Sequence, residues 1–210
     1  MRILIVGATG GTGRELVKQG LERGHEVTAF ARRPEAVAVR HENLRVARGD
    51  VMDPASVAAA MAGQEAVLSA LGHKRWFYPT RILSQGTANL LDAMAKQGVR
   101  RFVCETSLGV GESWWRLGLY YTLFVIPVIL PLYYWDKNRQ ERIVRASAAD
   151  WILVRPGALN NGRKRGVYRH GRHVGNPIWT VRISRADTAD FMLNQLADDT
   201  YLRAAPGVAW

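Results

Sequence analysis

Residues 1–13, MRILIVGATGGTG, decide the fold. Residues 2–6 form an apolar run typical of a buried β-strand, a glycine-rich stretch follows at once, and a helical pattern begins at Gly11. Glycines permit a tight turn and a close backbone approach to a pyrophosphate, and the start of a helix offers N–H groups and a positive dipole to an anion. A strand, this loop and a helix in that order predict a dinucleotide-binding unit rather than an ordinary glycine-rich loop. The glycine spacing is G-x-x-G-x-x-G, which differs from the usual G-x-G-x-x-G.

The rest of the chain alternates apolar runs with helical patterns. Strands are expected at residues 2–6, 26–30, 44–47, 66–71, 101–105, 151–154 and 181–183. Helices are expected near residues 11–23, 54–61, 79–97, 137–147 and 185–196. This alternation predicts an α/β protein with a mainly parallel, doubly wound sheet whose ligands lie beyond the carboxyl ends of the strands. A length of 210 residues fits a single Rossmann-type domain spanning residues 1–210.

Two segments interrupt this alternation. The first is an aromatic and apolar insertion at residues 114–135, in which residues 117–135, LGLYYTLFVIPVILPLYYW, carry no charge. A helix of this length would reach about 28 Å, barely enough to span a bilayer core, and Pro127 and Pro131 would break it. We therefore expect a buried element or an apolar wall for a large substrate, with attachment to a partner or membrane surface as the less favoured alternative.

The second segment, residues 162–175, is basic: it carries five Lys or Arg and two His in 14 positions. It is interpreted as a solvated face or as a site for an acidic group on a substrate or carrier.

The composition indicates which classes of ligand and which cellular compartment to expect. The formal net charge of +11 has no accompanying nucleic-acid-binding motif, so phosphate-bearing or other anionic small molecules are favoured over nucleic acid. Cys104 is the one cysteine, and the strand pattern from Arg2 leaves no room for a targeting segment, so a reducing cytoplasm is expected. We expect no metal, and a monomer or small homo-oligomer.

Residues after the second and third expected strands bear on cofactor choice. An NAD site usually places a carboxylate after the second strand, whereas arginine accommodates the 2′-phosphate of NADP(H). Here the strand is followed by Arg32 and Arg33, which favours NADP(H), with solvated arginines as the alternative. Asp50 is expected either to reach adenine or to cap the helix that begins at Pro54. Beyond the fourth strand, Gly72 would let the backbone pass close to the cofactor, and His73 is interpreted as a surface histidine.

Further motifs occur along the whole chain. They are GATGGTG (7–13), GDV (49–51), AGQEAVLSALG (62–72), SQG (84–86), Thr106-Ser107, VRPG (154–157) and DFML (190–193). In order and spacing they resemble the atypical short-chain dehydrogenase/reductase group, in particular the NAD(P)H-binding, NmrA-like proteins that include biliverdin-IXβ/flavin reductase.

The resemblance implies where the cofactor lies. The implied contacts are Gly7, Thr9, Gly10, Gly11, Thr12, Gly13, Arg32, Arg33, Asp50, Val51, Leu71, Gly72 and Ser107, with Pro156 and Gly157 at the nicotinamide end.

Ser107, Tyr133 and Lys137 are the candidate catalytic residues. Tyr133 and Lys137 have the Tyr-x-x-x-Lys spacing, which on a helix puts both side chains on one face. Asp136, however, is predicted to cap a helix that starts there, which would leave Tyr133 outside the helix. We therefore predict that Ser107 lies at the nicotinamide, that Lys137 touches the cofactor ribose or is structural, and that Tyr133 is not the essential acid.

The expected activity is hydride transfer from NADPH to a planar conjugated acceptor such as a flavin, tetrapyrrole, quinone or enone. Two alternatives remain open: an NmrA-like protein that senses nucleotides without turnover, and a biosynthetic enzyme that uses the fold for ketone reduction or non-redox chemistry.

Overall fold

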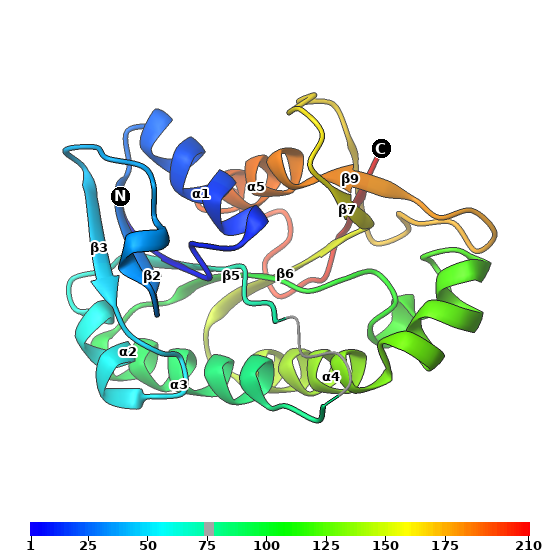
Figure 1. Cartoon of the computed structure of the whole chain (residues 1–210), viewed down its shortest axis with the longest axis horizontal. Coiled ribbons are helices and arrows are strands. Elements are labelled where there is room, and N and C mark those ends of the chain that lie inside the picture. The colour runs from blue at the N-terminus through cyan, green and yellow to red at the C-terminus, as the bar shows by residue number, and fades with distance from the viewer. Residues whose placement is uncertain (74–77) are drawn as a thin grey trace.

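A mostly parallel sheet forms the centre of the computed structural model, which describes residues 1–73 and 78–210 (Figure 1). The described residues contribute eight strands to it, in the order β3-β2-β1-β4-β5-β6-β10-β8. Their bounds are β1 (Arg2–Val6), β2 (Glu26–Ala31), β3 (Leu44–Arg48), β4 (Ala66–Ser69), β5 (Arg101–Glu105), β6 (Asp150–Pro156), β8 (Arg169–Gly171) and β10 (Gly207–Ala209). Strand β8 pairs antiparallel with β10, and the other neighbours are parallel.

Helices cover both faces of the sheet, which confirms the doubly wound prediction. Helices α1 (Gly11–Glu22) and α5 (Arg185–Asn194) lie on one face (Figure 1). Helices α2 (Pro54–Met61), α3 (Ile82–Gln97) and α4 (Pro131–Ala146) lie on the other (Figure 1).

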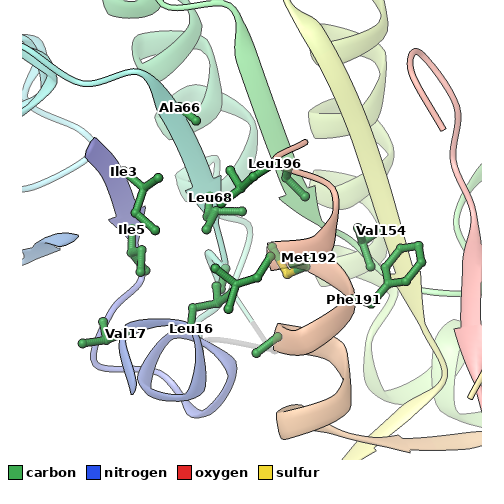
Figure 2. Close-up of a cluster of buried hydrophobic side chains, with 14 of the residues drawn as sticks. Ile3, Ile5, Leu16, Val17, Ala66, Leu68, Val154, Phe191, Met192 and Leu196 are labelled. Carbon is green, nitrogen blue, oxygen red and sulfur yellow. The ribbon is translucent and has the colours of Figure 1, made fainter. Parts of the chain in front are cut away.

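Strand β1 shows how the sequence builds two cores. Side chains alternate between the faces of a sheet, so Ile3 and Ile5 point one way and Leu4 and Val6 the other. The first pair joins a cluster with residues of α1 and α5 (Figure 2), and the second pair joins a cluster with residues of α2, α3 and α4. An apolar strand buried on both faces is what a parallel sheet requires.

Several short elements differ from the sequence prediction. The strand expected at residues 181–183 is β9 (Arg182–Ser184), and it pairs with β7 (Ala158–Asn160) in a separate two-stranded sheet instead of joining the main one. Strands β7, β8 and β10 were not predicted, because three residues are too few for a periodic pattern to stand out.

Helix α4 starts earlier than predicted. It begins at Pro131, whose fixed φ suits the first helical position. Asp136 is fully buried inside α4 and caps α3 instead, since its carboxylate accepts hydrogen bonds from the backbone N–H groups of Leu83 (2.9 Å) and Ser84 (3.2 Å). The predicted cap position was therefore wrong, and Tyr133 lies within the helix.

The segment before α4 is wound more widely than an α-helix. After a 3₁₀ turn, η2 (Gly111–Ser113), residues Tyr121–Ile129 form a π-helix, η3, which contains Pro127. The N–H of Leu130 donates to the carbonyl of Val125 at 2.9 Å, the five-residue spacing of a π-helix. Among the described residues, no helix is long and apolar enough to cross a membrane.

A buried ion pair joins α4 to the sheet. Arg155 on β6 donates to both carboxylate oxygens of Glu141, at 2.9 and 2.5 Å, and both residues are buried. The Thr106 hydroxyl donates to the same carboxylate at 2.8 Å. Glu112, which is exposed, approaches the other side of Arg155 at 3.0 Å.

Removing the charge of Glu141 should destabilise the fold strongly. Breaking a buried pair leaves an uncompensated charge, at a cost of about 3–5 kcal/mol. We expect Glu141→Gln to lower the free energy of unfolding by about that amount in urea titrations, and Glu112→Gln, on the exposed side of Arg155, by about 1 kcal/mol or less. Equal effects of the two substitutions would contradict this account of the pair.

Candidate cofactor site

A cavity of about 920 Å³ opens at the carboxyl ends of β1, β2, β4 and β5 and extends to α4. The predicted site residues that line it are Gly7, Thr9, Gly10, Gly11, Thr12, Arg32, Asp50, Val51, Leu71, Gly72, Tyr133 and Lys137. The predicted residues that are not among its lining are Gly13, Arg33, Ser107, Pro156 and Gly157. The structure thus gathers most of the glycine-loop and β2-end residues into one cavity.

The glycine loop fits an anion. Gly7 adopts a φ of 78°, in the left-handed region that favours glycine. A Cβ on Gly13 would collide with the carbonyl oxygen of Gly7, so Gly13 serves the packing of α1 against the loop rather than the cavity wall. In the described part of the chain no side chain caps the N-terminus of α1, and Gly10, Gly11 and Thr12 line the cavity there. Backbone N–H groups at an uncapped helix start suit a pyrophosphate.

Two arginines border this loop from different elements. Arg32, at the end of β2, is exposed and lines the cavity, whereas Arg33 is exposed and is not among the lining residues. Arg185, the first residue of α5, lies against Gly11, lines the cavity and donates to Asn161 at 2.8 Å. Sequence reasoning missed Arg185, because the glycine loop lies more than 170 positions earlier in the chain.

The structure decides between the two roles considered for Asp50. Helix α2 is capped by Asp53, whose side chain accepts from the N–H groups of Ala55 (3.0 Å) and Ser56 (3.3 Å). The Asp50 carboxylate accepts from the N–H of Met52 at 3.0 Å and lines the cavity. The helix-cap alternative is therefore wrong, and contact with adenine stays a prediction.

Two buried ionisable residues, Glu105 and Lys137, line the cavity. The Thr12 hydroxyl donates to Glu105 at 2.9 Å, and the ammonium of Lys137 donates to the Glu105 backbone carbonyl at 3.5 Å. Burial raises the pKa of Glu105, and the charge of Lys137 opposes that shift. Burial also works against the charge on Lys137, but Tyr133, Glu105, Cys104 and Glu141 together outweigh it, so the pKa of Lys137 is raised. Sequence reasoning missed Glu105, whose position at the end of an expected strand gave no separate signal.

Tyr133 lies at the cavity, one helical turn before Lys137 in α4. The ammonium nitrogen of Lys137 is 5.3 Å from the centroid of the Tyr133 ring. His73, interpreted from sequence as a surface residue, also lines the cavity and meets Tyr133 edge-on with ring centroids 4.9 Å apart. The reason for setting Tyr133 aside, its expected place outside the helix, was wrong.

The Ser107 hydroxyl bonds within its own loop and lies beside a residue of α4. It is half-buried, and its hydroxyl donates to the Leu108 carbonyl at 2.8 Å and lies 3.0 Å from the hydroxyl of Tyr134. Pro156 and Gly157 are buried, and a Cβ on Gly157 would press on the Val181 carbonyl. Contacts of these three residues with the nicotinamide stay predictions.

Apolar side chains from the segment just before Tyr133 line the cavity. They are Val125 and Ile129 of η3 and Leu130, which follows η3, and Leu159 of β7 also lines the cavity. The insertion at residues 114–135 thus contributes part of the cavity wall.

The strand order and the place of the cavity define the class of protein. Strands β3-β2-β1-β4-β5-β6 have the doubly wound Rossmann order, and the cavity lies where that order reverses, between β1 and β4. A family described as NAD(P)H-binding matches residues 7–199. The chain therefore belongs to this NAD(P)H-binding family, which confirms the resemblance seen in the motifs.

Among curated relatives, an uncharacterised chloroplast protein of Arabidopsis thaliana is 31% identical over 173 residues, which are 76% of this chain and 60% of the relative. The photosystem II assembly factor Ycf39 of Synechocystis is 30% identical over a stretch that covers 53% of this chain and 35% of the length of Ycf39. A 3-beta-hydroxysteroid dehydrogenase of Mycolicibacterium neoaurum is 36% identical over a stretch that covers 52% of this chain and 32% of the dehydrogenase. The matches thus span from about a third to 60% of these longer proteins.

Solved structures share the fold. The oxidoreductase ylbE of Lactococcus lactis superposes with a TM-score of 0.85 at 22% identity, covering 100% of this chain and 90% of its own. ChuY of Escherichia coli O157:H7, described as an anaerobilin reductase, superposes with a TM-score of 0.81 at 22% identity. The superposition covers 100% of this chain and 97% of ChuY. A short-chain dehydrogenase/reductase of Veillonella parvula, solved with NADP, superposes with a TM-score of 0.81 at 19% identity. The superposition covers 100% of this chain and 94% of that protein.

Substituting the two arginines separately should show which one selects the cofactor. Arg32 lines the cavity, so Arg32→Ala should raise the Kd for NADPH about tenfold and leave the Kd for NADH within about twofold. The reason is that a hydrogen bond to a charged group contributes about 1.5–3 kcal/mol, and less at an exposed site. Arg33→Ala is the matched control and should change both constants little. Titration calorimetry measures all four changes. Equal losses for both nucleotides in Arg32→Ala would overturn the assignment of a 2′-phosphate site.

Proposed function

We propose that this protein is an NADPH-dependent reductase that transfers a hydride to a planar conjugated acceptor. The observation that carries the proposal is that one cavity joins the uncapped glycine loop and Arg32 to an apolar end containing Tyr133 and Lys137. The volume of about 920 Å³ lies at the upper end of the range for small-molecule sites, as a large ligand requires.

Each polar group has a proposed task. The N-terminus of α1 and Arg185 hold the pyrophosphate, and Arg32 holds the 2′-phosphate. NADPH, when bound, supplies the hydride, so the protein has to position the acceptor, exclude water and provide a proton. Val125, Ile129 and Leu159 form the apolar surface against which a flat acceptor would lie.

Tyr133 is the proposed proton donor. Its ring lies beside the Lys137 ammonium and the His73 ring, and a Cβ on Gly72 would lie 3.7 Å from its hydroxyl oxygen. Lys137 is held in turn by the Glu105 carbonyl. This assigns Lys137 a positioning role, and it reverses the prediction that Tyr133 is not the essential acid.

The assay that tests the function is NADPH oxidation at 340 nm with a panel of flavins, quinones and enones. Turnover with at least one acceptor, and slower turnover with NADH, is expected. Tight NADPH binding without turnover on the whole panel would contradict the proposal and favour a nucleotide-sensing protein.

Tyr133→Phe tests the proton donor. With the best acceptor from the panel, we expect turnover to fall at least tenfold while the Kd for NADPH stays unchanged, because general acid catalysis contributes about 10²–10⁴-fold. Tyr120→Phe is the control, since Tyr120 is exposed and is not among the cavity-lining residues. Unchanged turnover in Tyr133→Phe would show that solvent supplies the proton.

A further inference from the structure

The outer side of η3 and of the residues before it is exposed and apolar. Exposed fractions are 61% for Trp114, 50% for Leu119, 60% for Tyr120, 69% for Leu123, 47% for Phe124 and 60% for Val128. We call these six residues the aromatic face. An exposed apolar surface of this kind on a protein marks an interaction site.

A neighbouring loop extends the aromatic face. The N–H of Leu119 donates to the carbonyl of Ile178 at 3.1 Å, and Gly118 packs on the backbone of Trp179. Ile178 and Trp179 are 58% and 74% exposed. In Figure 1 the green segment that contains η3 and the orange loop that follows β8 lie together at the right end of the molecule, opposite β3.

Arginines stack on two tryptophans close in sequence to the aromatic face, and acids are missing from that stretch of sequence. Between Glu112 and Asp136 the chain has no acidic residue. The Arg116 guanidinium lies 5.2 Å from the ring centroid of Trp115, and that of Arg139 lies 4.9 Å from the ring centroid of Trp135. Neither arginine makes an ion pair within the described part of the chain.

We propose that the aromatic face docks this protein on a lipid bilayer that contains anionic headgroups. Tryptophan and tyrosine prefer the boundary between headgroups and acyl chains, and an apolar helix face with neighbouring cations binds in the plane of that boundary. The net charge of +11 adds attraction to an anionic surface.

Charge also argues against a second copy of the chain as the occupant. A two-fold dimer brings the same surface of both subunits together, so Arg116 and Arg139 would face a patch bordered by the same unpaired cations. An anionic membrane neutralises these charges instead.

Docking in this way would place the apolar end of the cavity near the membrane. Val125 and Ile129 line the cavity from the same helix, η3, that presents Leu123 and Val128 outward. The docking proposal stands independently of turnover, because it concerns the outer side of η3.

Flotation of the full chain with vesicles tests the proposal without any nucleotide. Vesicles of equal parts phosphatidylglycerol and phosphatidylcholine should carry the protein to the lipid fraction, and pure phosphatidylcholine vesicles should carry at least tenfold less. Leu123→Glu and Val128→Glu should each lower the partition coefficient at least tenfold. Val39→Glu is the matched control, because Val39 is exposed in the loop before β3 and should leave partitioning within twofold.

Three results would overturn the proposal. The first is a wild-type protein that stays out of the lipid fraction. The second is that the Leu123→Glu and Val128→Glu variants float as well as the wild type. The third is a dimer in light scattering that Val128→Glu converts to monomer, which would assign the aromatic face to a second copy. Thermal unfolding midpoints equal to that of the wild type establish that the variants are folded.

Discussion

The close approach of Gly13 to the carbonyl of Gly7 is the constraint on which the site depends. Because neither position tolerates a side chain, α1 can start directly after β1 and lie against the loop. That geometry leaves the N-terminus of α1 facing the cavity with no side-chain cap. An uncapped helix start costs stability in the absence of a ligand, and a bound anion recovers it. Packing and the proposed recognition of the cofactor therefore rest on the same few backbone atoms.

Helix α4 holds the other half of the site. Asp136 caps α3, Lys137 bonds to the Glu105 carbonyl of β5, and Glu141 pairs with Arg155 of β6, so two successive turns of one helix are tied to three different elements. Tyr133, at the start of the same helix, is thereby fixed at the cavity. Asp136, Lys137 and Glu141 are buried and each has a polar partner, which is the condition under which buried charges persist.

The sequence predicted the parts of the structure that local chemistry controls. Apolar runs and helical periodicity gave the main strands and helices, and glycine spacing gave the loop where Gly7 and Thr12 line the cavity. The start of α4 was missed because Asp136 has the chemistry of a cap but serves a helix more than 50 positions earlier. Arg185 and Glu105 were missed for a similar reason, since tertiary packing alone brings them to the glycine loop. Long-range partners of this kind leave no periodic signal in a single sequence.

We infer that the cavity between the glycine loop and α4 binds NADPH in one orientation. A crystal structure of the protein grown with NADPH tests this inference most directly. We expect the pyrophosphate on the N–H groups at the start of α1, the 2′-phosphate beside Arg32 and the nicotinamide at the end lined by Tyr133 and Lys137. A nucleotide bound elsewhere, or one lying in the cavity with its 2′-phosphate away from Arg32, would contradict it.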